Sequence, residues 1–399
     1  MSSTTRFQLS FMMFLQYFVW GCWYVTMGTY LSKSLNCDGG QIGTAYASNA
    51  IAAMISPFFI GYVADRFLNT EKLLGLMHLI GAVLIYFAGK AESFETFFPL
   101  LLGYSLAYMP TLALSNSLCF HHITNPEKEF PSIRVLGTIG WIAAGLTIGF
   151  LNYADSSMQF TATAIMSVIM GIYCFTMPAT PPKPREGKTT ISDILGLDAL
   201  KLLKDRSFAV MVIASVLFCI PLNFYYSFAG QFLGEVGLDN VAGKMTMGQM
   251  SEIGFMLLMP LFLSRFGVKN MIIIGLVGWI IRYVLFAHGT ADSGAWMLYL
   301  GIIIHGICYD FFFVTGQIYT DNKAPLSLRS SAQGLITFAT YGVGFFFGAK
   351  IAGEVVKAYA VSATEHHWQN VWYIPAGIAV VILVLFALLF NDNKTVVKG

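Results

Sequence analysis

The chain has 399 residues, of which 56% are hydrophobic and 11% are charged, and its formal net charge is +2. An ordinary globular domain carries roughly 25% charged residues, so this composition, with a mean hydropathy of +0.66, excludes a soluble globular protein and indicates an integral membrane protein. The cationic residues are scattered and form no basic tract, which excludes a nucleic-acid-binding protein.

Apolar segments long enough to span a bilayer follow one another along the chain. In the first half they are predicted at residues 8–32, 42–64, 72–90, 97–120, 131–152 and 158–177. In the second half they are predicted at residues 207–233, 246–264, 270–288, 295–320, 328–356 and 368–390. The expected fold class is therefore an all-α integral membrane protein with twelve transmembrane helices.

A polar connector divides these segments into two sets. Residues 178–206 begin PATPPKPREGKTT, and their prolines and charges end a helix. We therefore expect an N-terminal half at 1–177, a cytoplasmic linker at 178–206 and a C-terminal half at 207–399. Six segments on each side of a basic linker are the layout of two six-helix pseudo-repeats, which is the major facilitator fold.

Basic residues indicate the orientation. Most of the 23 Lys and Arg residues lie in the two terminal segments and in the connectors after even-numbered apolar segments. Because basic residues accumulate on the cytoplasmic side of a membrane, we expect both termini in the cytoplasm.

Two connectors carry related motifs. Gly61, Asp65 and Arg66 follow the GxxxDR pattern of a loop motif of the major facilitator superfamily, and Arg265 lies in a degenerate copy in the second half. Two interpretations remain open: a charged gate that stabilises a closed interface, or cytoplasmic topology alone.

Two polar residues interrupt the apolar segment at 246–264. Gln249 and Glu252 are three residues apart and share a helix face, which places an amide beside a carboxylate. A charged side chain in the middle of a membrane helix is disfavoured by roughly 2.5 to 3.5 kcal/mol and usually faces a bundle interior or an aqueous cavity. Glu252 is therefore a candidate functional residue. The alternative is a carboxyl group that is neutral or paired with a neighbour on its own helix.

Three further segments place polar and aromatic side chains at helical spacing. One face of 131–152 offers Arg134, Thr138 and Trp141; residues Asn223 and Tyr226 share a face after Pro221; His305 and Tyr309 share a face, with Asp310 about 100° further round. Aromatic planes beside hydrogen-bonding groups suit a small polar ligand with a flat ring, and a sugar would be bound by similar groups.

Other polar and small residues are interpreted as structural. His78 and Arg282 have no partner at helical spacing, and Gly344 and Gly348 predict close helix packing. The six cysteines form neither a CxxC motif nor a zinc-binding pattern, so we expect no disulfide framework and no metal. The sequence contains no GxSxG, HExxH or phosphate-binding glycine motif, so it gives no indication of an enzyme.

Several longer stretches resemble the nucleoside:proton symporter family, the family of the bacterial nucleoside permeases. They are LQYFVWGCWYVTMGTY at 15–30, AYMPTLALSNSL at 107–118, FPSIRVLGTIGW at 130–141, and the shorter QMSE, PLFLSRFGVKN, YDFFF and RSSAQG. The resemblance runs nearly end to end. It implies proton-driven nucleoside uptake by alternating access across the bacterial cytoplasmic (inner) membrane.

The resemblance also implies site residues. Nucleoside-binding positions of the family correspond to Arg134, Thr138, Trp141, Asn223, Tyr226, Gln249, Glu252, His305 and Tyr309, followed by Asp310. Trp141 and Tyr309 replace Phe and keep an aromatic plane, whereas Asn223, Tyr226 and His305 replace Gln, Asn and Tyr. These three changes alter the hydrogen-bonding groups available to a nucleobase.

The two carboxyl groups have separate expected roles. Burial disfavours an ionised carboxylate, so we favour Asp310 as the proton carrier and Glu252 as a ligand for hydroxyl groups, although the reverse assignment is also open. The expected partners are a nucleoside, protons and membrane lipids, with no nucleic acid, no cofactor and a monomeric chain. The alternative function is transport of a different small polar solute, such as a sugar or a nucleobase.

Overall fold

A computed structural model of the chain describes residues 1–66, 68–124, 126–181, 197–325, 328–362 and 365–391. Within these ranges the side chains at 57–66, 126–128, 197–198 and 330 are not described. The described chain is almost entirely helical, with one short two-stranded sheet, and it divides into two compact units.

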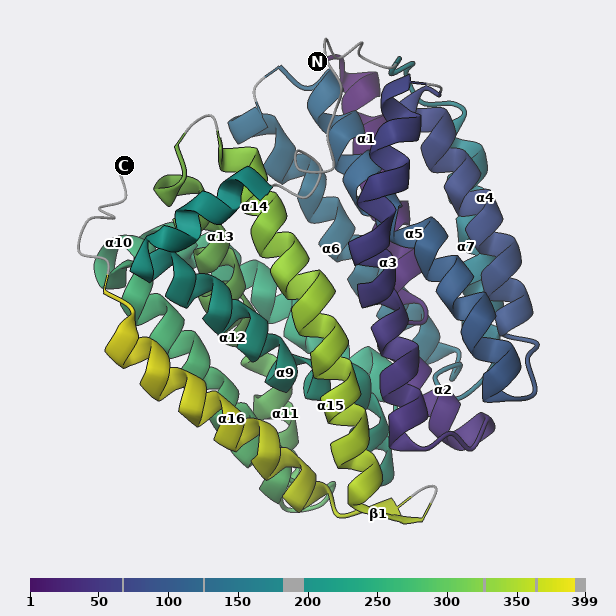
Figure 1. Ribbon diagram of the computed structural model, residues 1–399. Coiled ribbons are helices and arrows are strands. Elements are labelled where there is room, and N and C mark those ends of the chain that lie inside the picture. The colour runs from purple at the N-terminus through teal and green to yellow at the C-terminus, as the bar shows by residue number, and fades with distance from the viewer. Residues whose placement is uncertain (67, 125, 182–196, 326–327, 363–364, 392–399) are drawn as a thin grey trace. The chain divides into compact units, whose positions relative to one another are not determined.

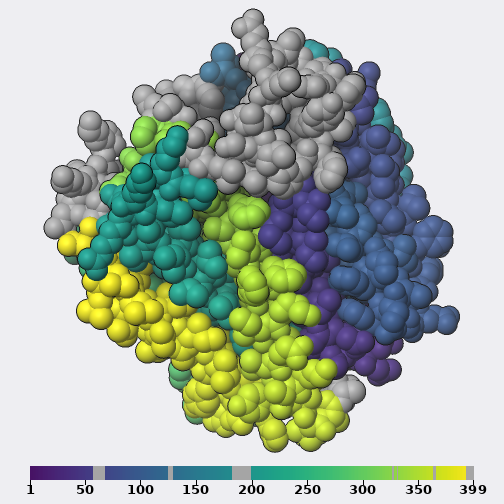
Figure 2. Space-filling model, viewed as in Figure 1, coloured from purple at the N-terminus to yellow at the C-terminus, as the bar shows by residue number. Residues whose placement is uncertain are grey.

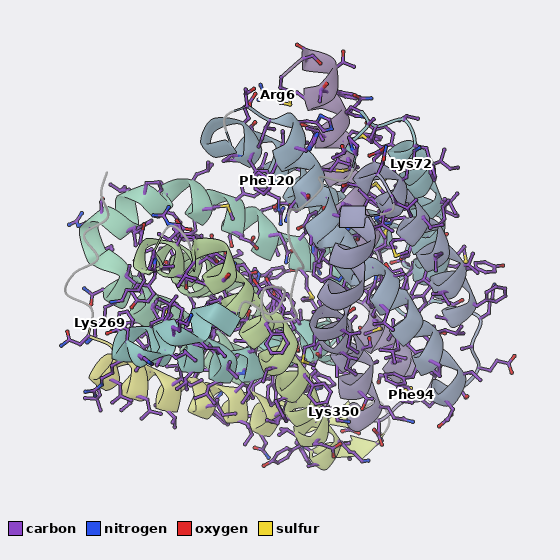
Figure 3. The ribbon with its side chains drawn as sticks, turned by 45° about the horizontal axis from the view of Figure 1, so that its top comes forward. Arg6, Lys72, Phe94, Phe120, Lys269 and Lys350 are labelled. Carbon is purple, nitrogen blue, oxygen red and sulfur yellow. The ribbon has the colours of Figure 1, made fainter. Side chains whose placement is uncertain are left out.

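The first unit comprises Met1–Cys37, Ile51–Thr189 and Asn240–Gly243. Its helices are α1 (Ser3–Gly21), α2 (Met27–Ser34), the second half of α3 (Gly39–Arg66), α4 (Thr70–Ala88), α5 (Phe94–His122), α6 (Pro126–Phe150) and α7 (Met158–Cys174). α1 packs along α6, and α4 packs against α5 and α7 (Figure 1). Lys72 near the start of α4 and Phe94 at the start of α5 lie at opposite ends of these neighbouring helices (Figure 3).

A buried hydrogen-bonded network joins three helices of the first unit. Gln16 on α1 donates from Nε2 to Thr111 Oγ1 at 2.7 Å and lies 2.8 Å from His78 Nε2 through its Oε1 atom. Tyr108 donates its hydroxyl to the Gln16 carbonyl oxygen at 2.7 Å. All four side chains are buried, and buried polar groups are stable only when paired. His78 thus has its partner on another helix, which agrees with a structural role.

The predicted segment at 8–32 is not one helix. α1 ends at Gly21 and α2 begins at Met27, with hydrogen-bonded turns between them. Thr26 in this break donates its hydroxyl to Gln159 Oε1 at 2.7 Å, and a Cβ atom at Gly21 would lie 2.9 Å from Ala144 Cβ. Hydropathy could not indicate the break, because the turn residues are as apolar as the helices that flank them.

The second unit comprises Asp38–Ala50, Thr190–Asp239 and Lys244–Gly399. Besides the start of α3, its elements are η1 (Leu197–Lys204), α9 (Arg206–Glu235), α10 (Val241–His288), α11 (Ala295–Ile303), α12 (His305–Tyr309), η2 (Asp310–Val314), α13 (Thr315–Lys323), α14 (Arg329–Thr337), η4 (Phe338–Gly344), α15 (Phe345–Ala358), β1 (Ala360–Ser362), β2 (Glu365–His366) and α16 (Trp368–Leu389). α9 packs against α15 and α16, and Figure 2 shows these three helices in teal, lime and yellow on one face.

Helices of the second unit depart from regular α-geometry at Gly267 and in two π-helical segments. α10 changes direction at Gly267, whose φ of 69° is readily accessible to glycine, and this residue lies between the predicted segments 246–264 and 270–288. η2 and η4 are π-helical. Such wider turns are uncommon and occur frequently at functional sites.

Glycines permit close contacts around α15. The predicted packing at Gly344 and Gly348 is confirmed, because added Cβ atoms there would lie 2.8 Å from Cys219 Cβ and 2.5 Å from the Cys219 carbonyl oxygen. At the other end of α15, a Cβ atom at Gly353 would lie 2.5 Å from the carbonyl oxygen of Gly39 at the start of α3. Small residues of this kind let membrane helices approach closely.

Polar contacts flank this α3–α15 contact. Lys350, labelled in Figure 3, donates to Thr44 Oγ1 at 2.7 Å, and Lys357 lies 3.0 Å from Asp38. Partial burial raises the pKa of Asp38, but the Gln41 amide and Lys357 lower that pKa more, so it lies below the ordinary value. The stabilisation from Asp38 is therefore present above the ordinary carboxyl pKa and is lost as the pH falls through the lowered pKa.

Seven helices in the described ranges are long and apolar enough to cross a membrane. An eighth span results if α11 and the helical run from His305 to Lys323, which meet at a bend of 44°, are counted together. The chain is therefore an all-helical membrane protein.

Replacing Gly353 by alanine tests the close α3–α15 contact. The added methyl group cannot fit against the Gly39 backbone, so we expect Gly353→Ala to reduce stability by about 1–3 kcal/mol, as overpacking does. Gly377→Ala is the matched control, because a Cβ atom at Gly377 meets nothing within 4 Å. Equal thermal unfolding of both variants in detergent would contradict the packing.

Candidate functional site

The predicted site residues of the second unit gather around His305. His305 begins α12 and is fully buried. The Tyr225 ring of α9 stacks on its imidazole with centroids 5.1 Å apart, Tyr226 meets it edge to face at 6.1 Å, and Tyr309 lies at 5.8 Å. Three phenol rings from two helices therefore surround the imidazole.

Glu252 of α10 approaches the same imidazole. Its Oε2 atom lies 3.8 Å from His305 Nε2, and its side chain is 17% exposed. The two helices meet closely because Ser251 Oγ accepts a hydrogen bond from the Gly306 amide at 3.0 Å, while a Cβ atom at Gly306 would lie 2.7 Å from the Ser251 carbonyl oxygen. The sequence placed Glu252 and His305 on separate helices, and this contact brings them together.

Two carboxamides also belong to the predicted site residues of this unit. Gln249 is buried one helical turn before Glu252. Asn223 of α9 is also buried, and its Nδ2 atom donates to the Cys219 carbonyl oxygen at 2.7 Å. One of the two N–H donors of the Asn223 amide is therefore used inside its own helix.

Asp310 lies at the first position of the π-helical segment η2. Its side chain is fully buried, and neither carboxyl oxygen has a hydrogen-bond partner among the described residues. An ionised carboxylate is costly to bury without hydrogen bonds. This environment therefore favours the protonated, uncharged acid.

The two π-helical segments are linked beside Asp310. Tyr309, the residue before Asp310, and Tyr341 of η4 share a hydrogen bond between their hydroxyl groups at 2.8 Å. Tyr309 was expected to provide an aromatic plane. Its hydroxyl group is hydrogen-bonded to Tyr341, a residue that the sequence analysis did not single out.

Arg282 is a buried cation that the sequence assigned to a structural role. Its side chain is fully buried, and its Nε atom donates to the Gly301 carbonyl oxygen at 2.8 Å. The guanidinium lies over the Tyr225 ring at 4.1 Å and the Trp279 ring at 4.6 Å. Gly301 and Tyr225 lie on other helices, whereas Trp279 lies three residues before Arg282 on α10. The signals that could have identified Arg282 are therefore the cost of a cation within an apolar membrane segment and an aromatic ring at helical spacing.

The predicted residues of the first unit lie along α6 beside aromatic rings. Trp141 of α6 packs edge to face with Trp20 at 5.3 Å and with Tyr24 at 6.1 Å. Two helical turns before it, Arg134 holds its guanidinium over the Tyr17 ring at 4.0 Å. Thr138 lies between them on α6 and is half-buried. A cation, a hydroxyl and aromatic rings thus follow one another along α6 where α1 packs against it.

The predicted gating motif is only partly described. Gly61, Asp65 and Arg66 have side chains outside the described residues, so nothing is added to the two interpretations of this motif. Arg265 in the second copy is exposed, with its guanidinium 5.9 Å from the Phe266 ring.

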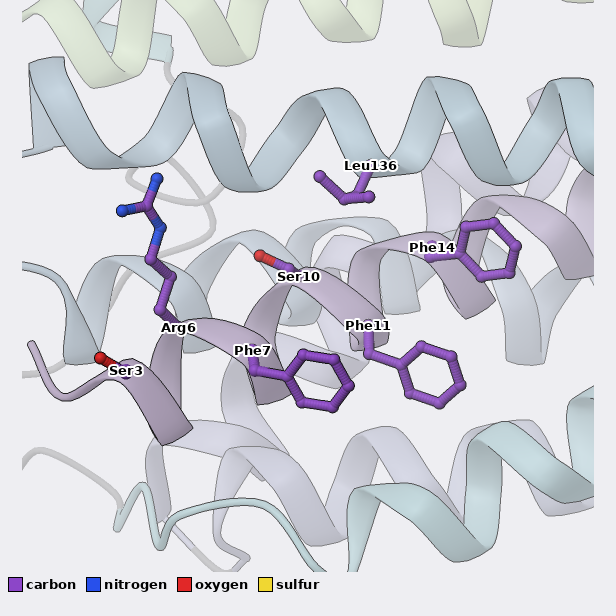
Figure 4. Close-up of a pocket in the computed structure, with 7 residues that line it drawn as sticks. All are labelled: Ser3, Arg6, Phe7, Ser10, Phe11, Phe14 and Leu136. Carbon is purple, nitrogen blue, oxygen red and sulfur yellow. The ribbon is translucent and has the colours of Figure 1, made fainter.

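An open apolar hollow of about 480 Å³ lies elsewhere on the first unit (Figure 4). It is lined by Ser3, Arg6, Phe7, Ser10, Phe11, Phe14 and Leu136, from α1 and α6, and includes none of the predicted site residues. Exposed phenyl rings of this kind suit contact with lipid hydrocarbon. No group of three or more His, Cys, Asp or Glu that could hold a metal ion occurs in the part of the chain described.

Comparison with known proteins places the chain in a family. A family model described as "Nucleoside H+ symporter" matches residues 3–395. YegT of Escherichia coli (strain K12) is 46% identical over 98% of this chain and 94% of its own length. The nucleoside permease NupG and the xanthosine permease of the same organism are 34% and 33% identical, each over 97% of this chain and 96% of their own length.

Solved structures agree with this placement. A crystal structure of the nucleoside transporter NupG, 33% identical, superposes with a TM-score of 0.89 over 97% of this chain and 99% of that chain. A D-xylose-proton symporter shares the fold at 15% identity, with a TM-score of 0.74. The relatives are permeases and transporters, not enzymes. From its sequence and its fold, the chain belongs to the nucleoside H+ symporter family.

Proposed function

We propose that the chain takes up nucleosides together with protons by alternating access across the bacterial inner membrane. Membership of the family supports the coupled reaction. The observation that carries the proton-coupled part is the buried Asp310, whose carboxyl oxygens have no hydrogen-bond partner in the described part of the chain. A carboxyl group in such a place can exist without charge when protonated and must be solvated or paired when it loses the proton.

The proposed architecture is that of twelve transmembrane helices in two six-helix pseudo-repeats. The N-terminal half is residues 1–177, the cytoplasmic linker is 178–206 and the C-terminal half is 207–399. The distribution of Lys and Arg supports cytoplasmic termini. The chain acts as a monomer in contact with membrane lipids.

Two sets of side chains bind the nucleoside. In the first unit Trp141 provides a plane for the base, and Arg134 and Thr138 provide hydrogen-bond donors. In the second unit the ligands are Asn223, Tyr226, Gln249, Glu252, His305 and Tyr309. Glu252 binds hydroxyl groups of the sugar, because a carboxylate accepts hydrogen bonds strongly.

Asp310 carries the proton. It takes up the proton on the outer side, stays uncharged while buried, and releases it on the inner side when that side opens to water. Because the bound proton and the bound nucleoside favour the same conformations, each changes the population of transporting states through its own contacts.

The main test is uptake of labelled uridine and adenosine into vesicles that contain the purified protein. We expect accumulation only with an inward proton gradient, and competition by nucleosides but not by free ribose or free uracil. Uptake that ignores the gradient would refute proton coupling. Inhibition of nucleoside uptake by free ribose or free uracil would favour the alternative substrate, a sugar or a nucleobase.

The roles of the two carboxyl groups are separated by matched amide variants. Asp310→Asn should abolish gradient-driven accumulation while nucleoside binding at equilibrium persists, because the amide stays uncharged. Glu252→Gln should weaken binding itself, since the amide is a poorer acceptor for hydroxyl groups. Full accumulation by Asp310→Asn would exclude Asp310 as the carrier, and the opposite pattern of effects would exchange the two roles.

Stacking at Trp141 is tested by graded truncation. Stacking of a base on an aromatic side chain is worth about 1–3 kcal/mol, so Trp141→Ala should weaken nucleoside binding by about that amount. Trp141→Phe keeps a ring and should retain most of the affinity. Equilibrium binding of uridine measures both, and equal losses in the two variants would contradict stacking of the base on Trp141.

A further inference from the structure

Five ring side chains of the second unit form a closed circuit of contacts. The His305 imidazole lies 5.8 Å from the Tyr309 ring and 6.1 Å from the Tyr226 ring, measured between centroids. Phe345, the first residue of α15, lies 6.4 Å from the Tyr226 ring and stacks on Tyr341 of η4 at 5.1 Å. A hydrogen bond of 2.8 Å between the hydroxyl groups of Tyr341 and Tyr309 completes the circuit. The sequence pointed to three of these rings, and the structure adds Tyr341 and Phe345.

One face of the run from η4 into α15 is turned toward the predicted site residues of α9. Tyr341, Phe345 and Gly348 lie about one helical turn apart along this run. The Phe345 ring contacts the Tyr226 ring. A Cβ atom at Gly348 would lie 2.7 Å from Asn223 Nδ2. Tyr341 therefore lies at the end of a face that follows two predicted site residues.

The phenol rings of the circuit are reachable, whereas the groups beside them are not. Tyr226, Tyr309 and Tyr341 are each partly buried, and the bond between the hydroxyl groups of Tyr309 and Tyr341 is also only partly buried. His305 and Asp310 are fully buried. A ligand can therefore contact the phenol groups without displacing the fully buried side chains.

The pair of hydroxyl groups offers both a donor and acceptors. Two hydroxyl groups hold two protons, and the bond between Tyr309 and Tyr341 uses one of them, whichever oxygen donates it. The second proton is directed away from the pair, and each oxygen keeps acceptor capacity. A sugar hydroxyl also donates and accepts, so it can match the pair in either arrangement. The polar atoms on the edge of a nucleobase are fixed as donors or acceptors and favour one arrangement.

We propose that Tyr341 is a further substrate-binding residue, whose hydroxyl group binds a hydroxyl group of the nucleoside's sugar. This inference rests on the proposed uptake of nucleosides. Glu252, the proposed ligand of the sugar hydroxyls, approaches the same circuit, because its Oε2 atom lies 3.8 Å from His305 Nε2. The phenol pair thus lies where the sugar is expected, and Tyr341 adds selectivity for one of its hydroxyl groups.

Sugar analogues test this contact through equilibrium binding. Tyr341→Phe keeps the ring that stacks on Phe345 and removes only the hydroxyl group. We expect uridine affinity to fall about three- to tenfold, the usual contribution of one neutral hydrogen bond. Among 2′-deoxyuridine, 3′-deoxyuridine and 5′-deoxyuridine, the analogue that lacks the contacted hydroxyl should bind the variant and the unmodified protein equally well. The other two should lose affinity as uridine does. Unchanged uridine affinity, or equal losses for all four ligands, would overturn the proposal.

Tyr373→Phe is the matched control for this substitution. It also removes a hydrogen-bonded hydroxyl group, one that lies 2.7 Å from His288 Nε2 and outside the circuit. We expect unchanged affinity of this variant for all four ligands. Thermal unfolding in detergent shows whether both variants are folded.

Chemical labelling gives a second measurement that does not depend on Tyr341→Phe. The six cysteines are buried, so a thiol reagent should modify Tyr341→Cys above a low background. Saturating uridine should slow this modification, because the sugar would cover position 341, and should not slow modification of Tyr373→Cys. Modification of Tyr341→Cys at the same rate with and without bound uridine would overturn the proposal.

Uridine binding by the unmodified protein separates this inference from the proposed function. If the unmodified protein binds uridine and the analogues show no selective loss in Tyr341→Phe, only the Tyr341 contact is refuted. Absence of nucleoside binding by the unmodified protein would refute the proposed function and the sugar contact with it.

Discussion

The balance of buried charge in the second unit is the constraint on which the candidate site depends. Arg282 is a permanent cation whose terminal nitrogens have no hydrogen-bond partner in the described chain, and Asp310 is a buried carboxyl group with no such partner. In the same unit, Glu252 Oε2 lies 3.8 Å from His305 Nε2. Each added or removed proton changes the net charge of these largely buried side chains, so we expect proton binding and ligand binding to be coupled there.

The fold supports this arrangement with rings, wide helical turns and small residues. Aromatic rings of Tyr225 and Trp279 cover the Arg282 guanidinium and bring it to His305. Asp310 begins a π-helical segment, whose turns are wider than those of an α-helix. Gly306 allows α10 and α12 to approach, which places Glu252 beside the imidazole. The site thus depends on backbone contacts as much as on its polar side chains.

Much of this could be predicted from the sequence because hydropathy and helical spacing are local properties. The helices lie at the predicted apolar segments, and Gln249 and Glu252 do share one helix. Contacts between helices could not be predicted in this way. His78 was expected to have no partner at helical spacing, and its partner Gln16 comes from another helix. For Arg282 the same expectation is wrong, because Trp279 three residues earlier on α10 contacts the guanidinium, as does Tyr225 from another helix.

Departures from a regular helix also could not be predicted from the hydropathy of the sequence. The break between α1 and α2 and the π-helical segments lie in stretches of unbroken apolar character, where hydropathy gives the same value for a turn, an α-helix and a π-helix. The break depends on contacts such as that between Thr26 and Gln159, which are distant in the sequence.

Proton movement driven by the nucleoside tests the central claim most directly. Nucleoside would be added to weakly buffered vesicles that contain the protein, with no gradient imposed, while the external pH is recorded. Coupled uptake predicts that uridine makes the external medium more alkaline, that a proton ionophore abolishes this change, and that Asp310→Asn shows none. Nucleoside entry without any change in external pH would contradict a proton-coupled site in this chain.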